Sequence, residues 1–164
     1  MGYTDAQNLL AEAQAVTAAA ATTDYINLGP YGAQIDVDAG INTNTSINLG
    51  NSAKALYCVV TCMTTMDDTG DDSTLEFKLQ TDDNTSFSSP ADVIVVGTFP
   101  ATSPAGTRYW KQLPADVDYQ QYLRGYFTPS GGNLSAGAFT VEITLDAPKW
   151  KPGVQARSYS QGTA

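Results

Sequence analysis

The alternation of hydrophobic and polar residues in short segments is the feature that most restricts the fold of this chain. From Leu75 to Leu79, hydrophobic residues alternate with Glu76 and Lys78, and residues 139–145 alternate in the same way. A period of two sends successive side chains to opposite faces of an extended strand, whereas an amphipathic helix needs a period near 3.6. These segments are therefore predicted to be strands with one buried face.

Further segments of the chain share this strand-like pattern. Together, the predicted strands cover residues 25–28, 33–37, 46–49, 54–64, 74–80, 93–98, 108–113, 122–128 and 138–146. Clusters of Gly, Pro, Asn, Asp and Ser separate them, and such clusters are typical of turns. About eight strands with no helix between them predict an all-β fold, a jelly-roll type β-sandwich.

Residues 1–23 do not follow the strand pattern. Leu9, Ala13 and Val16 recur at helical spacing, but the stripe is rich in alanine and buries little apolar area. We expect an N-terminal arm, partly helical or extended, that becomes ordered when Leu9, Leu10 and Val16 contact a neighbouring protein.

The rest of the chain is expected to form one domain and a tail. A length of 164 residues is ordinary for a single domain. We assign residues 24–147 to the jelly-roll domain. Residues 148–164 are rich in Gly, Ser and Gln, and we expect a loose C-terminal tail there.

The charge balance argues against two classes of partner. The sequence has 8 Lys and Arg against 17 Asp and Glu, a net charge of −9. A nucleic-acid backbone or an anionic membrane surface would repel such a protein. No apolar run is long enough to span a bilayer, and no basic segment followed by an apolar core marks a secretory signal. We expect neither nucleic acid nor membrane as a partner.

The sequence offers little material for catalysis. It contains no His, which removes the commonest general base and excludes Ser-His and Cys-His nucleophilic pairs. Glu76 and Glu142 are the candidates for a carboxylate pair, but both occupy polar faces of predicted strands, where we expect them to be solvated. Cys58 and Cys62 lie about 13 Å apart along one predicted strand, beyond the ~7 Å limit for a disulfide, so we expect two buried thiols. The protein is expected not to be an enzyme.

An acidic loop is the one candidate metal site. Residues 67–72 contain four Asp residues between two predicted strands, and oxygen ligands at this density could hold Ca²⁺. The spacing departs from that of an EF-hand, and Asp is also common in solvated turns. We favour the turn and expect no cofactor.

One predicted strand carries a candidate interaction surface. Alternation places Tyr122, Arg124 and Tyr126 on one face and Leu123 and Phe127 on the other. If Leu123 and Phe127 enter the core, the other three point outward, and Tyr and Arg are enriched at protein interfaces. An ordinary half-buried aromatic ladder that stabilises the sheet is an equally good interpretation.

The chain resembles the Bbp16-type capsid cement proteins of tailed phages. The resemblance covers most of residues 4–146 and rests on the order of several short stretches. These are residues 5–10, 14–17, 24–29, 75–83, 113–114, 121–124, 131–132 and 136–140. No single stretch is diagnostic, and residues from Trp150 onward are not part of the match.

The resemblance implies a structural role in the virion. It implies a jelly-roll subunit that is made in the host cytoplasm and assembles as a homodimer or homotrimer on the outer surface of the head. There it would bind the major capsid protein and stabilise contacts between capsid subunits. The competing hypotheses are a carbohydrate-binding β-sandwich or fibre-associated adhesion protein, and a tail or head-completion protein.

Overall fold

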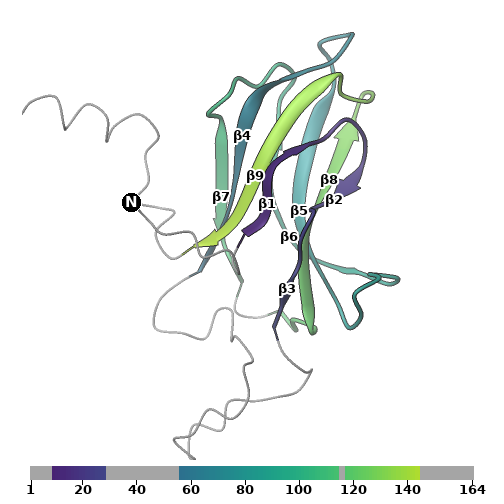
Figure 1. The fold of residues 1–164 in the computed structure, drawn as a ribbon, viewed down its shortest axis with the longest axis vertical. Coiled ribbons are helices and arrows are strands. Elements are labelled where there is room, and N and C mark those ends of the chain that lie inside the picture. The colour runs from purple at the N-terminus through teal and green to yellow at the C-terminus, as the bar shows by residue number, and fades with distance from the viewer. Residues whose placement is uncertain (1–8, 29–55, 115–116, 145–164) are drawn as a thin grey trace, which may run out of the picture.

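The computed structural model describes residues 9–28, 56–114 and 117–144. These residues form nine strands and no helix, and the strands make two sheets that pack face to face (Figure 1). The chain is therefore an all-β sandwich, as the alternating segments predicted.

Both sheets are antiparallel. The first sheet has the order β1-β9-β4-β7 and consists of β1 (Leu9–Ala15), β9 (Ala136–Thr144), β4 (Tyr57–Asp67) and β7 (Arg108–Gln112). The second sheet has the order β2-β8-β5-β6, with β3 also paired to β8. It consists of β2 (Ala20–Ala21), β3 (Ile26–Asn27), β8 (Tyr122–Ser130), β5 (Thr74–Asp82) and β6 (Ala91–Phe99).

The strand order is that of a jelly roll. Both β2 and β3 pair with β8, so they act as one interrupted strand and the described sandwich has eight strand positions. Counted along the chain, these positions lie in the orders 1-8-3-6 and 2-7-4-5. Every connection crosses between the sheets except the β5–β6 hairpin. Two four-stranded sheets linked in this way are the jelly-roll arrangement.

Seven of the nine predicted segments coincide with β3 through β9. The other two, residues 33–37 and 46–49, lie outside the described residues, as does the predicted tail. The alternation succeeds because strands that bury one face carry a strict period of two. In β9, for example, every second residue from Gly137 to Ile143 is buried.

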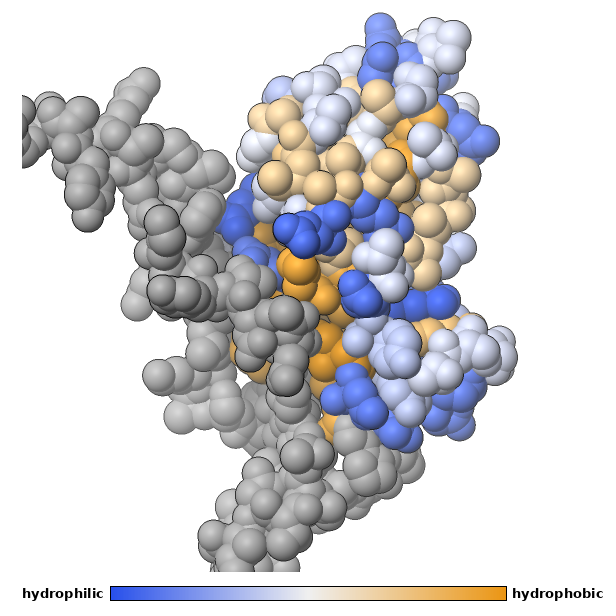
Figure 2. Space-filling model, in the orientation of Figure 1, coloured by the Kyte–Doolittle hydropathy of each residue, from blue (hydrophilic) through white to orange (hydrophobic). Residues whose placement is uncertain are grey.

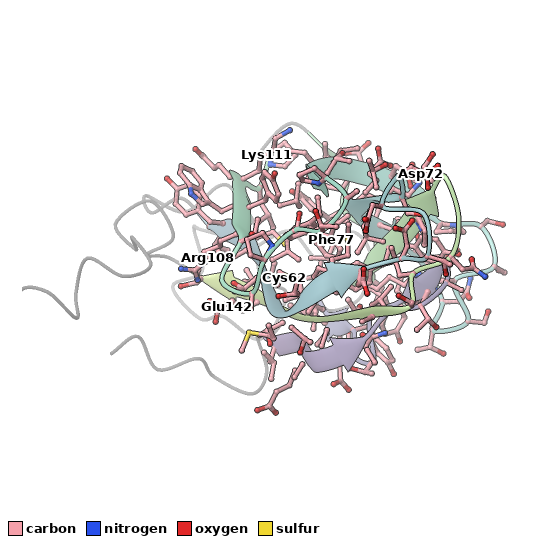
Figure 3. The ribbon with its side chains drawn as sticks, turned by 90° about the horizontal axis from the view of Figure 1, so that it is seen from above. Cys62, Asp72, Phe77, Arg108, Lys111 and Glu142 are labelled. Atoms are coloured by element: carbon pink, nitrogen blue, oxygen red, sulfur yellow. The ribbon has the colours of Figure 1, made fainter. Side chains whose placement is uncertain are left out.

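Four phenylalanine rings link the sheets through the core. Phe127 of β8 lies 4.7 Å from Phe77 in its own sheet and 5.4 Å from Phe139 of the first sheet, measured between ring centroids. Phe139 in turn lies 5.1 Å from Phe99 of β6. All four rings are fully buried, and Figure 3 shows Phe77 and Cys62 between the sheets. Each buried ring of this kind stabilises the fold by several kcal/mol relative to alanine.

A glycine in β8 lets a strand and a ring approach closely. A Cβ on Gly125 would lie 2.5 Å from the Phe77 ring and 2.6 Å from the Thr22 methyl carbon. The Gly125 N–H instead donates to the Thr22 hydroxyl at 3.0 Å, and the Thr22 N–H donates to the Gly125 carbonyl at 3.0 Å. The segment that follows β1 is thereby fixed to the second sheet.

The prediction of an N-terminal arm over residues 1–23 is wrong for residues 9–23, the part of it that the structure describes. β1 pairs with β9, and Leu10 and Val16 are fully buried in the core. Two register shifts interrupt β1, and Ala13 has a φ of +45°. These irregularities shift the phase of alternation, so an edge strand imitates helical spacing. The small alanine side chains suit an edge where the chain crosses to the second sheet.

Both cysteines are free and buried, as predicted. Burial raises the pKa of the Cys58 thiol, and the Glu142 carboxylate raises it further. Burial also raises the pKa of Cys62, although backbone hydrogen bonds at Met66 and Thr64 oppose the effect. Both side chains behave as small apolar groups of the core, since little thiolate forms at neutral pH.

The place of β1 in the core gives a direct test of stability. Leu10→Ala is expected to lower the free energy of unfolding by about 2–5 kcal/mol, because it leaves a cavity between the sheets. Glu12→Ala, on the exposed side of the same strand, is expected to change it by less than about 0.5 kcal/mol. Urea denaturation measures both. Equal, negligible effects would mean that β1 is a dispensable arm after all.

Candidate interaction surface

Alternation in β8 is as predicted. Leu123 and Phe127 have no exposed surface, whereas Tyr122, Arg124 and Tyr126 lie half-buried on the outer face of the second sheet. We call these three residues the outer row. Pairing with β5 sets its neighbours, which are Asp82 opposite Tyr122, Gln80 opposite Arg124 and Lys78 opposite Tyr126.

A chain of polar contacts crosses this face from β6 to β8. The Lys78 ammonium lies 2.7 Å from Asp92 Oδ2, and Gln80 Nε2 donates to Asp92 Oδ1 at 2.9 Å. The side-chain amide oxygen of Gln80, Oε1, accepts hydrogen bonds from Arg124 Nε at 3.2 Å and from Arg124 NH2 at 3.1 Å. The hydrogen bond from Lys78 is the main cause of the lowered pKa of Asp92. Gln80 therefore holds the arginine while it binds Asp92 on its other side.

The loop between β5 and β6 covers part of the same face. Phe87 is only 7 % exposed, and its ring centroid lies 4.2 Å from the Arg124 guanidinium carbon. Tyr25 stands edge-on to Phe87 at 6.3 Å and to Tyr122 at 5.4 Å. We call Tyr25, Phe87 and the outer row the outer cluster. The outer row is thus already packed against residues of its own chain, which the sequence did not reveal.

One carboxylate holds the loop in place. Asp82 Oδ1 accepts from the backbone N–H groups of Asp83 at 2.7 Å and Asn84 at 3.3 Å, and Oδ2 accepts from that of Ser89 at 3.0 Å. Burial raises the pKa of Asp82, but these hydrogen bonds outweigh it and the pKa is lowered overall. They also offset the cost of Phe87, whose φ of +47° is unfavourable for a bulky residue.

The outer face of the first sheet carries a different set of residues. Arg108 of β7 reaches across β4 and forms an ion pair with Glu142 of β9 at 3.2 Å, and Figure 3 shows the two side chains together at this side of the molecule. Trp110 is 44 % exposed and lies edge-on to Tyr57 at 5.6 Å. Sequence reasoning placed Glu142 in solvent and missed its pairing, because the partner depends on the register of three strands.

The two carboxylates considered for a catalytic pair, and expected instead to be solvated, do not meet. Glu76 lies on β5 and Glu142 on β9, so they occupy the outer faces of different sheets. In the acidic loop, Asp68 Oδ2 accepts from the Ser73 N–H at 2.9 Å, and hydrogen bonds to Ser73 lower the pKa of Asp68. Within the described residues, no three His, Cys, Asp or Glu side chains are grouped to hold a metal ion. The same part of the chain contains no helix, and so none that is long and apolar enough to cross a membrane.

A family model named Bbp16 matches residues 10–143, a range that extends from β1 to β9. The chain belongs to the Bbp16 family. No curated protein matches it. In this Bbp16-family chain, the matched range begins inside β1, which agrees with the structural finding that β1 is part of the domain.

The structure separates the predicted contact residues of this Bbp16-family chain into two groups. Leu10 and Val16 are wholly inside the core, so the prediction that they contact a partner is wrong. Leu9 is half-buried at the start of β1. Figure 2 shows a strip of hydrophobic residues near the middle of the face that is turned to the viewer. The outer row is accessible, and its role in binding stays a prediction. Phe87 was missed, although a lone aromatic residue in a Ser-rich loop is a usable signal.

Stability at low pH tests the role of Asp82. A carboxylate with a lowered pKa in the folded state stabilises the fold above its ordinary pKa, and that contribution is lost as the pH falls through the folded-state pKa. Asp82→Asn is expected to lower the free energy of unfolding at pH 7 by about 1 kcal/mol, as hydrogen bonds to the loop are lost. It should also reduce the loss of stability below about pH 4.

Thermal melts from pH 7 to pH 2 measure this effect. Asp24→Asn, at an exposed position, is the matched control and should behave like wild type. If Asp82→Asn and wild type show parallel pH profiles, Asp82 does not hold the loop through its charge.

Proposed function

We propose that this protein is a capsid cement protein that binds the outer surface of a tailed-phage head and joins neighbouring major capsid proteins. The Bbp16 family match over residues 10–143 carries the proposal, because the cement function is what resemblance to that family implies. The proposed location is the virion, and the proposed partners are the major capsid protein and further copies of this chain. The protein is proposed to catalyse nothing.

The described surface supports binding through side chains on the outer faces of the sheets. The outer cluster presents Tyr and Arg side chains on the outer face of the second sheet, supported by the buried Phe87 ring, and Tyr and Arg concentrate binding energy at interfaces. Trp110 and Met63 are 44 % and 49 % exposed on the first sheet. A rigid sandwich with adhesive residues on both faces suits a protein that contacts more than one neighbour.

The ring geometry favours this function over carbohydrate binding. A sugar stacks on the flat face of an aromatic ring, so a glycan platform presents exposed rings in similar orientations. The Tyr25 and Tyr122 rings instead lie at 87° to each other, and the Tyr57 and Trp110 rings at 79°. Tyr25 also stands edge-on to Phe87 at 60°. These edge-to-face pairs stabilise one another and leave no common flat surface.

Undecorated heads of the phage that encodes the chain provide the test. Purified protein is expected to bind such heads and to delay the release of packaged DNA during heating. The effect should be large even when each contact is weak, because many copies act on one shell. DNA release is followed by dye fluorescence, and cryo-electron microscopy of decorated heads locates the bound density.

The controls separate this proposal from its competitors. Heads mixed with the destabilised Leu10→Ala protein above its melting temperature should release DNA like untreated heads. Failure of wild type to bind heads, or density at the tail or inside the shell, would contradict the cement function. Retention on a glycan array together with failure to bind heads would favour the carbohydrate-binding class.

A further inference from the structure

Arg124 is the half-buried cation of the described strands that has no ion-pair partner. Lys78 pairs with Asp92 and Arg108 pairs with Glu142, whereas Lys111 is exposed to solvent. Arg124 is half-buried on β8, and no carboxylate of the described residues lies within ion-pair distance of it. Burial lowers the pKa of Arg124, but an arginine stays protonated in proteins. The fold therefore keeps a partly desolvated positive charge without a counterion.

The nearby carboxylates are already occupied by other groups. Asp92 accepts from Lys78 and Gln80, as described above. Asp82 attracts Arg124 at longer range, but its oxygens accept from backbone N–H groups of the β5–β6 loop. With these acceptors engaged, no acidic residue in the described part of the chain forms an ion pair with Arg124.

The guanidinium is nevertheless held in a fixed position. Two of its donor atoms, Nε and NH2, donate to the side-chain oxygen Oε1 of Gln80. The Phe87 ring covers one face, with 4.2 Å between the ring centroid and the guanidinium carbon. The Tyr126 ring centroid lies 5.4 Å from the guanidinium carbon. An arginine has five N–H groups, and no hydrogen bond from NH1 is formed within the described residues. A planar group held in this way loses little entropy when it binds a ligand.

We propose that Arg124 is the binding site for a carboxylate side chain of a protein partner, which joins it through the NH1 edge of the guanidinium. The identity of that partner as the capsid shell rests on the proposed function above. Charge complementarity selects the ligand, because a desolvated guanidinium beside aromatic rings is matched by a planar anion. The net charge of −9 repels acidic surfaces only weakly beyond the Debye length of about 8 Å. Arg124 therefore recognises a carboxylate through short-range contacts, and the net charge of the whole protein has little influence on this binding.

A titration with acetate tests the carboxylate site without any phage component. The Nε–Hε signal of Arg124 in a proton–nitrogen correlation spectrum is expected to shift and saturate as sodium acetate is added. The Arg108 signal is an internal control, because that side chain is already paired with Glu142, and it should shift far less. Sodium chloride at equal ionic strength should not reproduce the Arg124 shift. No shift with acetate, or the same shift with chloride, overturns the proposal.

Binding to undecorated heads tests the role of the site in docking. Arg124→Lys keeps the charge but loses the planar fork, and we expect it to weaken head binding at least about tenfold. Lys111→Gln removes an exposed cation from the first sheet and should bind like wild type. Thermal melts confirm that each variant is folded. If folded Arg124→Lys binds heads as tightly as wild type, the proposed docking contact is wrong.

The two experiments distinguish failure of the inference from failure of the proposed function. A specific acetate shift in a protein that does not bind heads would support the carboxylate site and contradict the cement function. Wild-type binding to heads with no specific acetate shift would leave the cement function intact and overturn the carboxylate site.

Discussion

The contact between Phe127 and Phe139 is the interaction on which the rest of the structure depends. It joins the two sheets at 5.4 Å, while Phe77 packs against Phe127 within the second sheet and Phe99 makes a further contact with Phe139 between the sheets. Because these rings come from β8, β9, β5 and β6, the buried phase of alternation is set on all four strands. The outward phase follows from it. The position of Arg124 on the surface is thus a consequence of the phenylalanines beneath it.

The sequence predicted those parts of the fold in which one local rule decides the outcome. Strict alternation identified β5 and β9, and the facing of Arg124 followed correctly from the same period of two. β1 was misread because its bulges and the positive φ of Ala13 break that period. A bulge is a property of the strand pair, so the sequence of one strand does not reveal it.

The candidate site was predicted only in part for a related reason. The composition of the outer row was legible, but its neighbours come from segments far away in the sequence. Gln80 lies 44 residues from Arg124, and Phe87 contacts the guanidinium from a loop whose backbone N–H groups bind Asp82. Because of those contacts, we interpret the outer row as an arginine held in place by Gln80 and Phe87, and not as a row of aromatic residues alone. Register and loop conformation were required for that conclusion.

The pairing of β1 with β9 also has a consequence for synthesis of the protein. The first described strand finds its partner in the last one, across more than 120 residues of intervening chain. During synthesis on the ribosome, β1 can pair with β9 and bury Leu10 only after Val141 and its neighbours have been made. Contacts of such long range are slow to form. The strands that pair with β9, namely β1 and β4, therefore lack this partner until translation has passed β9. Only then can the first sheet cover the second completely.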